Sequence, residues 1–231
     1  MISSYDWAGG HEAMWRFGPD AGPVVLAALP LFEEANRTRA FLMTLLRALA
    51  ERGVASALPD LPGSGESLFP TETATLDRWR QAYDGAATLL AGEGRRVHGL
   101  GIRGGALVDS YALLHSRWFL SPQPGQAVVR ELGRIWQAAE PGADTGDMLG
   151  DGPPIPIAGN LVSRTLLGEL GGALPMLGPS TRVLRIEGDS QPADRWVPGS
   201  PLWRRVEPDN DPALAAVLAD DIADWIASCA S

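Results

Sequence analysis

The segment with the clearest chemical potential is a glycine-rich turn near the middle of the chain. Residues 97–105 read Val-His-Gly-Leu-Gly-Ile-Arg-Gly-Gly. The last five match G-x-S-x-G, a strained strand-to-helix turn that exposes a nucleophilic serine, except that Arg103 occupies the serine position. An arginine stays protonated at any working pH and cannot act as the nucleophile. At the start of a helix it would instead create an electropositive spot that suits a carboxylate or a phosphate.

The same glycines allow a second interpretation. Gly99, Gly101 and Gly104 spell G-x-G-x-x-G, the pattern of dinucleotide-binding turns. That pattern normally opens the first strand–helix–strand unit of a domain, and an acidic residue follows about 20 residues later at the end of a strand. Here two strand–helix units precede the glycines, and Glu131 falls in a helical pattern. A nucleotide-binding enzyme is therefore kept only as a third alternative.

The other members of a serine-hydrolase triad can be sought by their order, which is serine, then an acid, then histidine. Asp189 follows the expected strand 182–187 and stands at the acid position, with Asp194 as an alternative. The loop 207–212, where the histidine belongs, contains none. The three histidines of the chain lie elsewhere, at His11, His98 and His115. Because losing one triad member typically costs about 10⁴-fold in rate, we expect no ordinary ester or peptide hydrolysis.

The loop after the first expected strand normally supplies a backbone N–H to a developing oxyanion. Here it carries Glu33 and Glu34, whose charge would oppose an oxyanion and attract Arg103. We therefore expect Arg103 to contact one of these two glutamates. The candidate pocket residues are Phe32, Glu33, Glu34, Asn36, Arg39, Ile102, Arg103 and Gly104. Two structural alternatives stay open. Arg103 could form an ion pair that only stabilises the fold, or Glu33, Glu34, Asn36 and Arg39 could belong to the first turn of a helix, where acidic side chains are favourable.

Alternating apolar runs and helical patterns predict the elements that position these residues. In the first half we expect strands at 23–30, 54–58 and 96–100, helices at 37–52, 76–90 and 105–115, and a turn at 59–65. In the second half we expect a helix at 128–139, a loop at 141–154, an extended stretch at 155–163 with a tight turn at Gly159-Asn160, strands at 182–187 and 202–206, and a helix at 212–227. The pattern predicts one α/β domain over residues 1–231, with a mostly parallel sheet, helices on both faces, and 121–173 as a small cap-like insertion.

Composition narrows the classes of partner. The 231 residues are 45% hydrophobic and carry a net charge of −9, which argues against nucleic acid because phosphate binding needs a basic face. The single cysteine, Cys229, allows no internal disulfide. Residues 1–10 do not resemble a signal peptide, and no apolar run approaches the roughly 18 residues of a membrane span. We expect a cytoplasmic protein with no membrane span, no cofactor and no metal site.

Several segments resemble one bacterial family. Residues 30–39, Pro-Leu-Phe-Glu-Glu-Ala-Asn-Arg-Thr-Arg, are similar to its P-P-F-x-E-E-x-N-x-x-R segment, and residues 60–67 to its D-L-P-G-x-G-x-S turn. Residues 99–107, 157–161 and 201–203 are similar to its G-L-R-L-G-A, V-A-G-Y-x-L and P-F-W stretches. By these segments the chain resembles the α/β-hydrolase superfamily and, within it, exosortase A system-associated hydrolase 2. The resemblance implies an α/β-hydrolase fold and genes that lie beside those for exopolysaccharide synthesis and a protein-sorting membrane enzyme.

Fold alone does not fix function. Our leading interpretation is a catalytically silent hydrolase fold that binds a small anionic or acyl ligand, or a partner protein of the exopolysaccharide machinery. The alternative is an ester or thioester hydrolase with a non-standard catalytic set, in which Asp189 or Glu33 activates water.

Overall fold

Eight strands form one mixed sheet in the computed structural model, which describes residues 1–229. Their order is β1-β2-β4-β3-β5-β6-β9-β10. Neighbours from β4 to β10 run parallel, whereas β1 and β2 form an antiparallel edge. The strands are β1 (Ile2–Trp7), β2 (Gly10–Phe17), β3 (Val24–Ala28), β4 (Ala55–Pro59), β5 (Val97–Ile102), β6 (Ser116–Leu120), β9 (Thr181–Ile186) and β10 (Arg195–Val197). The predicted mostly parallel α/β sheet is confirmed.

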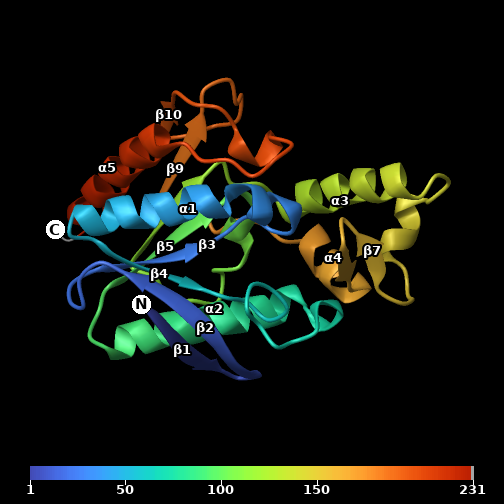
Figure 1. The fold of residues 1–231 in the computed structure, drawn as a ribbon, viewed down its shortest axis with the longest axis horizontal. Coiled ribbons are helices and arrows are strands. Elements are labelled where there is room, and N and C mark those ends of the chain that lie inside the picture. The colour runs from blue at the N-terminus through green and yellow to red at the C-terminus, as the bar shows by residue number, and fades with distance from the viewer. Residues whose placement is uncertain (230–231) are drawn as a thin grey trace.

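Helices cover both faces of this sheet (Figure 1). The α-helices are α1 (Glu33–Glu51), α2 (Leu76–Gly92), α3 (Gly125–Ala139), α4 (Arg164–Gly171) and α5 (Pro212–Ser228). Strand β3 is buried along its whole length, and its side chains alternate between two cores. Val25 and Ala27 pack in the core that contains α1 and α5, while Val24 and Leu26 pack in the core that contains α2. This explains why the strand has a continuous apolar sequence.

The segment between β6 and β9 forms a separate group of small elements. It contains α3, a 3₁₀ turn (Thr145–Leu149), the hairpin β7 (Ile155–Ile157) to β8 (Asn160–Val162), and α4. These elements lie together at the end of the molecule where the parallel strands finish (Figure 1). Their apolar side chains, including Leu132, Met148 and Leu166, belong to the same buried cluster as α2. The inserted segment (residues 121–180) is thus anchored to the α2 side of the sheet.

Two predicted elements are wrong. Residues 103–107 form only a 3₁₀ turn, and no α-helix occupies 105–115, so His115 precedes β6 instead of ending a helix. The paired glycines at 104–105 and the turn-forming Asp109-Ser110 disfavour a helix there. Residues 202–204 form a 3₁₀ turn instead of a strand, and the last strand is β10. A short apolar run does not distinguish a strand from a helical turn by periodicity.

The hairpin turn falls one residue earlier than predicted. Ala158 and Gly159, not Gly159 and Asn160, connect β7 to β8, with φ angles of 50° and 78°. Positive φ at both central residues is the geometry that matches the twist of a two-residue hairpin. The β1–β2 hairpin, β6, α4 and β10 were not predicted from the sequence.

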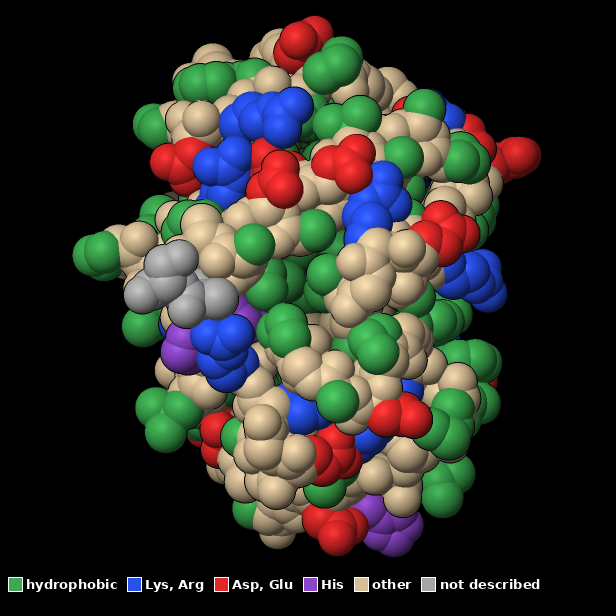
Figure 2. All heavy atoms as spheres, turned by 90° about the vertical axis from the view of Figure 1, so that its left-hand side faces the viewer, with side chains coloured by type: hydrophobic (Ala, Val, Ile, Leu, Met, Phe, Trp, Pro, Cys, Tyr) green, Lys and Arg blue, Asp and Glu red, His purple; other side chains and the backbone are tan. Residues whose placement is uncertain are grey.

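The surface opposite the inserted segment has mixed charge. Figure 2 shows acidic and basic side chains interspersed over this end of the molecule. None of the helices in the described part of the chain is long and apolar enough to cross a bilayer.

His98 links the stability of this fold to pH. It lies on β5, is 3% exposed, and has its Nδ1 atom 2.8 Å from the hydroxyl of Ser116. Burial, together with the nearby charges of His115 and Arg96, lowers the pKa of His98 to about 4. In the unfolded chain a histidine binds a proton near pH 6.5. The stability that neutral His98 contributes is therefore complete above pH 6.5 and is lost as the pH falls toward 4.

The variant His98→Asn tests this linkage. Between pH 7 and pH 5, the free energy of unfolding of the unmodified protein should fall by about 2 kcal/mol more than that of the variant. Asp109, whose pKa is raised to about 6 chiefly by burial, has the opposite dependence but is present in both proteins. Urea unfolding at the two pH values measures the difference. Equal pH dependence in both proteins would show that His98 is not held neutral by the fold.

Candidate functional site

Arg103 stands at the apex of a strained turn at the carboxyl end of β5. Its φ angle is +54°, in the left-handed region that residues with a Cβ rarely adopt. Directly after it, the backbone packs closely on the loop that follows β3. A Cβ atom added to Gly105 would lie 2.4 Å from the carbonyl oxygen of Leu29 and 2.6 Å from that of Ala28. In the sequence Arg-Gly-Gly, Arg103 adopts the strained apex, and Gly105 provides the position without a side chain that the close backbone contact requires.

Glu34 provides the partner of Arg103. The Nη2 atom of Arg103 lies 3.2 Å from Glu34 Oε1, and its Nε atom also donates to the same carboxylate. The predicted contact across the site is thus confirmed for Glu34. Glu33 instead pairs with Arg37, at 3.6 Å, one turn further along α1. Phe32, which precedes both acids, also has a left-handed φ of +55°.

Trp203 completes the surroundings of Arg103. The guanidinium carbon lies 5.0 Å from the centre of the indole ring, within the range of a cation–π contact. The carbonyl oxygen of Trp203 accepts a hydrogen bond from Arg37, which ties this turn to α1. No sequence pattern connected Trp203 with Arg103. The available signal was its place in the family-like segment 201–203.

The Arg103–Glu34 pair is largely removed from solvent. The two side chains are 18% and 16% exposed. Burial raises the pKa of Glu34, and the neighbouring charge of Arg103 opposes that rise. The Nε and Nη2 atoms of Arg103 both donate to Glu34. The Nη1 atom of Arg103 has no hydrogen-bond partner among residues 1–229. The ion pair therefore leaves the Nη1 donor of Arg103 free to bind a further acceptor.

Asp189 occupies the loop after β9, as predicted for a triad acid, but an arginine holds it. Arg185 donates from Nη1 at 2.9 Å, and the backbone N–H of Gln191 donates to the other oxygen. Although burial raises its pKa, these two hydrogen bonds bring the pKa of Asp189 below its usual range. The alternative acid, Asp194, accepts a hydrogen bond from the backbone N–H of Val183. Asp189 is consequently a weaker base than an ordinary aspartate.

In the described part of the chain, no histidine is positioned to act as a base beside Arg103. His98 lies near the start of β5, and His115 lies just before β6, so both are at the opposite end of the parallel strands from Arg103. His11 lies on the edge strand β2. The loop that follows the observed last strand, residues 198–211, contains no histidine.

Two adjoining polar clefts meet at Arg103, with volumes of about 490 and 650 Å³. The first also contains Glu33, Glu34 and α3 residues, and the second extends to Asp189. Six arginines and five acids line the two clefts together: Arg37, Arg103, Arg130, Arg134, Arg185 and Arg204 against Glu33, Glu34, Glu131, Glu187 and Asp189. The balance is slightly positive in a chain whose net charge is −9. Ser121 lies in the wall of the second cleft, and its buried hydroxyl has no hydrogen-bond partner among the described residues.

The predicted pocket residues do not form one pocket. Asn36 and Arg39 line a third cavity of about 440 Å³, which Arg103 does not reach. Phe32 lines both this cavity and the first polar cleft. Ile102 and Gly104 are buried behind the turn and line none of the three. The start of helix α1 therefore lies between two cavities: Glu34 faces the polar cleft at Arg103, whereas Asn36 and Arg39 face the third cavity.

The dinucleotide interpretation does not fit the observed turn. Gly99 and Gly101 lie within β5, where their backbone pairs with neighbouring strands. A five-residue 3₁₀ turn follows in place of the α-helix whose N-terminus would receive a pyrophosphate. We expected a helix N-terminus to attract an anion to Arg103, and this expectation is wrong because no α-helix begins there. An anion would instead be attracted by the arginine side chains. Within residues 1–229 no cluster of three or more His, Cys, Asp or Glu could hold a metal ion.

Comparison with known proteins connects this geometry to one fold. No protein-family model matches the chain, and no curated protein sequence matches it. Solved structures do match along nearly its whole length. The ferulic-acid-bound Est1E from Butyrivibrio proteoclasticus has a TM-score of 0.67 and 15% identity, with 97% of this chain and 99% of that chain covered.

Two further structures agree with it. A thermophilic esterase from Thermogutta terrifontis has a TM-score of 0.57 and 14% identity, covering 100% of both chains. XC6422 from Xanthomonas campestris, described as an a/b serine hydrolase without a lid, has a TM-score of 0.58 and 11% identity, with 99% of this chain and 94% of that chain covered. At such identities the likeness concerns the fold. Together with the mostly parallel sheet and the strained turn after β5, it establishes that this chain has the α/β-hydrolase fold.

Proposed function

We propose that this protein is a catalytically silent α/β-hydrolase-fold protein that works by binding, with an anionic group of its ligand received at Arg103. One observation carries the proposal: the left-handed apex of the turn, where this fold would present a nucleophile, holds an arginine paired with Glu34. A guanidinium cannot attack a carbonyl carbon. It can donate several hydrogen bonds to a carboxylate or a phosphate.

The surroundings favour binding over catalysis. A general base must be available beside the reacting group, and its pKa must lie near the working pH. The pKa of Asp189 is lowered, and Glu33 is engaged by Arg37. Neither group suits the activation of water that an unusual ester or thioester hydrolase would require. Arg130 and Arg204, by contrast, border the clefts without an ion-pair partner among the described residues.

The biological setting is a proposal that rests on sequence. The segments 30–39, 60–67 and 99–107 support a relationship to exosortase A system-associated hydrolase 2. We infer that the ligand is an anionic or acyl molecule of exopolysaccharide metabolism, or that a protein of that machinery is the partner. We further propose that the inserted segment acts as a small cap, since Gln123, Ala127 and Arg130 help to line the clefts at Arg103.

Anion binding at Arg103 can be tested with citrate as the probe. In a thermal-shift measurement at constant ionic strength, citrate should raise the melting temperature of the unmodified protein relative to NaCl, because a ligand that binds the folded state stabilises it. The variants Arg103→Gln and Arg130→Gln should each lose most of this increase.

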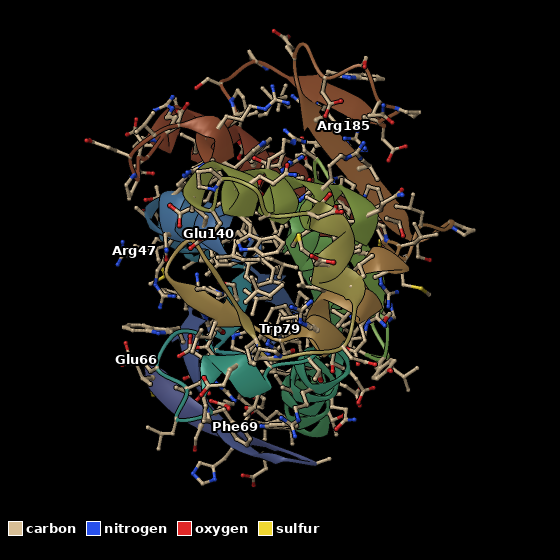
Figure 3. All side chains as sticks on the ribbon, turned by 90° about the vertical axis from the view of Figure 1, so that its right-hand side faces the viewer. Arg47, Glu66, Phe69, Trp79, Glu140 and Arg185 are labelled. Carbon is tan, nitrogen blue, oxygen red and sulfur yellow. The ribbon has the colours of Figure 1, made fainter. Side chains whose placement is uncertain are left out.

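Arg47→Gln is the matched control, because Arg47 is an exposed arginine of α1 that lines none of the three cavities. Figure 3 shows Arg47 at the outer edge of the view, away from the labelled Trp79 and Arg185. This control should keep the full citrate response. An equal citrate response in all four proteins would contradict an anion site at Arg103.

A further inference from the structure

The third cavity has the character of a separate binding pocket. It lies between the start of α1, the loop after β4, helix α2 and the β7–β8 hairpin, and has a volume of about 440 Å³. This volume falls within the range of about 300–1,000 Å³ that is usual for small-molecule sites. Polar and apolar groups share its wall about equally, and the apolar part includes Leu31, Phe32, Leu61, Phe69, Trp79 and Leu166.

The position of this pocket sets it apart from the clefts at Arg103. Figure 3 views the end of the molecule that carries the inserted segment, with Trp79 and Phe69 in the lower half and Arg185 at the upper edge. Trp79 and Phe69 line the pocket, whereas Arg185 lines the second polar cleft. Phe32 stands between the two sides, and its ring lies 5.9 Å from that of Trp79.

Most polar groups of the pocket wall are already engaged within the protein. The hydroxyl of Tyr83 donates to the carbonyl oxygen of Leu26, and the indole N–H of Trp79 donates to that of Pro62. The hydroxyls of Ser64 and Ser67 donate to the Leu61 carbonyl and to Glu12. These groups hold the wall in place and have little capacity left for a ligand.

Arg39 and Asn36 are different. They lie three residues apart on one face of α1, and neither side chain has a hydrogen-bond or ion-pair partner among residues 1–229. Among residues 1–229, Arg39 is also the only arginine that lines this cavity. Arg39 is half-buried and Asn36 is exposed, and both side chains carry N–H donors of the kind that bind the two oxygens of a carboxylate.

The acid of the pocket, Asp60, makes no direct contact with Arg39, although burial raises the pKa of Asp60 and the nearby charge of Arg39 opposes that rise. One oxygen of Asp60 accepts the backbone N–H of Glu66. The other lies against Gly65, where an added Cβ would approach it to 2.1 Å. Both oxygens are therefore directed to the loop of residues 61–66, and Asp60 forms no ion pair with Arg39 in the described residues.

We infer that this pocket binds a monocarboxylate with a medium-length apolar chain, whose chain lies against Phe32, Phe69 and Trp79 and whose carboxylate is held by Arg39 and Asn36. The inference goes beyond the anion site proposed at Arg103, because it concerns another cavity and another arginine. Leu68 and Leu161, two exposed apolar residues at and beside the pocket wall, provide an apolar approach to it.

Calorimetric titration with octanoate and with 1-octanol tests the inference, since the two probes share a chain and differ in charge. The unmodified protein should bind octanoate more tightly than octanol. Arg39→Gln should weaken octanoate binding about 10-fold or more and leave octanol binding unchanged. Ala35→Phe, which places a ring in the cavity from α1, should weaken both probes. Arg47→Gln, further along the same helix and outside the pocket, should bind both normally.

The outcomes separate this inference from the proposed function. Absence of octanoate binding to the unmodified protein would overturn the inference, as would normal octanoate binding by a folded Arg39→Gln variant. If Arg103→Gln lost octanoate binding while Arg39→Gln kept it, the carboxylate would lie at Arg103, and only the pocket assignment would fail. If Arg39→Gln lost octanoate binding while citrate had no effect on any variant, the pocket would stand and the anion site at Arg103 would fall.

Discussion

Replacing Asp221 with asparagine should lower the free energy of unfolding by about 3 kcal/mol. Asp221 lies on α5, is 4% exposed, and accepts four hydrogen bonds from three side chains. The indole N–H of Trp118 donates at 2.9 Å, Arg182 donates twice at 2.7 Å, and Arg195 donates at 2.9 Å. One carboxylate thus joins α5 to β6, β9 and β10. An asparagine would turn N–H donors toward these donors and remove the charge that compensates two arginines.

The neighbouring residue provides a matched control. Asp220 is 67% exposed and pairs with Arg52 at the surface, where solvent screens the ion pair, so Asp220→Asn should change the stability far less than Asp221→Asn. Chemical denaturation of both variants near pH 7 gives the comparison. A loss for Asp221→Asn no larger than that for Asp220→Asn would show that the buried network does not stabilise the edge of the sheet.

The same network predicts how the free energy of unfolding decreases at acid pH. Although burial raises it, the hydrogen bonds from Arg182, Trp118 and Arg195 lower the pKa of Asp221 to about 2. An unfolded aspartate titrates near 3.9. The stability that Asp221 contributes is therefore present above about pH 4 and is lost as the pH falls toward 2.

Sequence patterns were sufficient for the central sheet and for one contact of the site. The continuous apolar run of β3 and the glycines around Arg103 predict a buried strand and a strained turn, because both depend on local backbone and burial requirements. The Arg103–Glu34 contact followed from opposite charges at two loops that this fold brings together. The N-terminal hairpin gave no strong signal, because its strands form an edge and alternate between apolar and polar residues.

The division of the site into separate cavities could not be predicted. Glu34, Asn36 and Arg39 lie within six residues, and only the orientation of α1 decides that Glu34 faces Arg103 while the other two face the third cavity. That orientation depends on tertiary packing of α1 against α5 and the sheet. The contact between Arg103 and Trp203 joins residues 100 positions apart, so no local pattern indicated it.

Loss of the triad should remove hydrolysis almost completely. Removing a single member from such a triad typically lowers the rate about 10⁴-fold, and here both the serine and the histidine are replaced or absent. Substituting serine at the apex, Arg103→Ser, should not restore activity, because no histidine of the described residues lies beside it to accept the proton. The variant would also leave Glu34 partly buried without its arginine.

The most direct test of this account is the hydrolysis of p-nitrophenyl butyrate by the purified protein, measured beside Arg103→Ser and a buffer blank. A binding protein with Arg103 at the apex should release p-nitrophenol no faster than buffer at any substrate concentration, and the variant should do the same. Saturable turnover by the unmodified protein that falls in Arg103→Ser would contradict the account and place Arg103 in a working catalytic site.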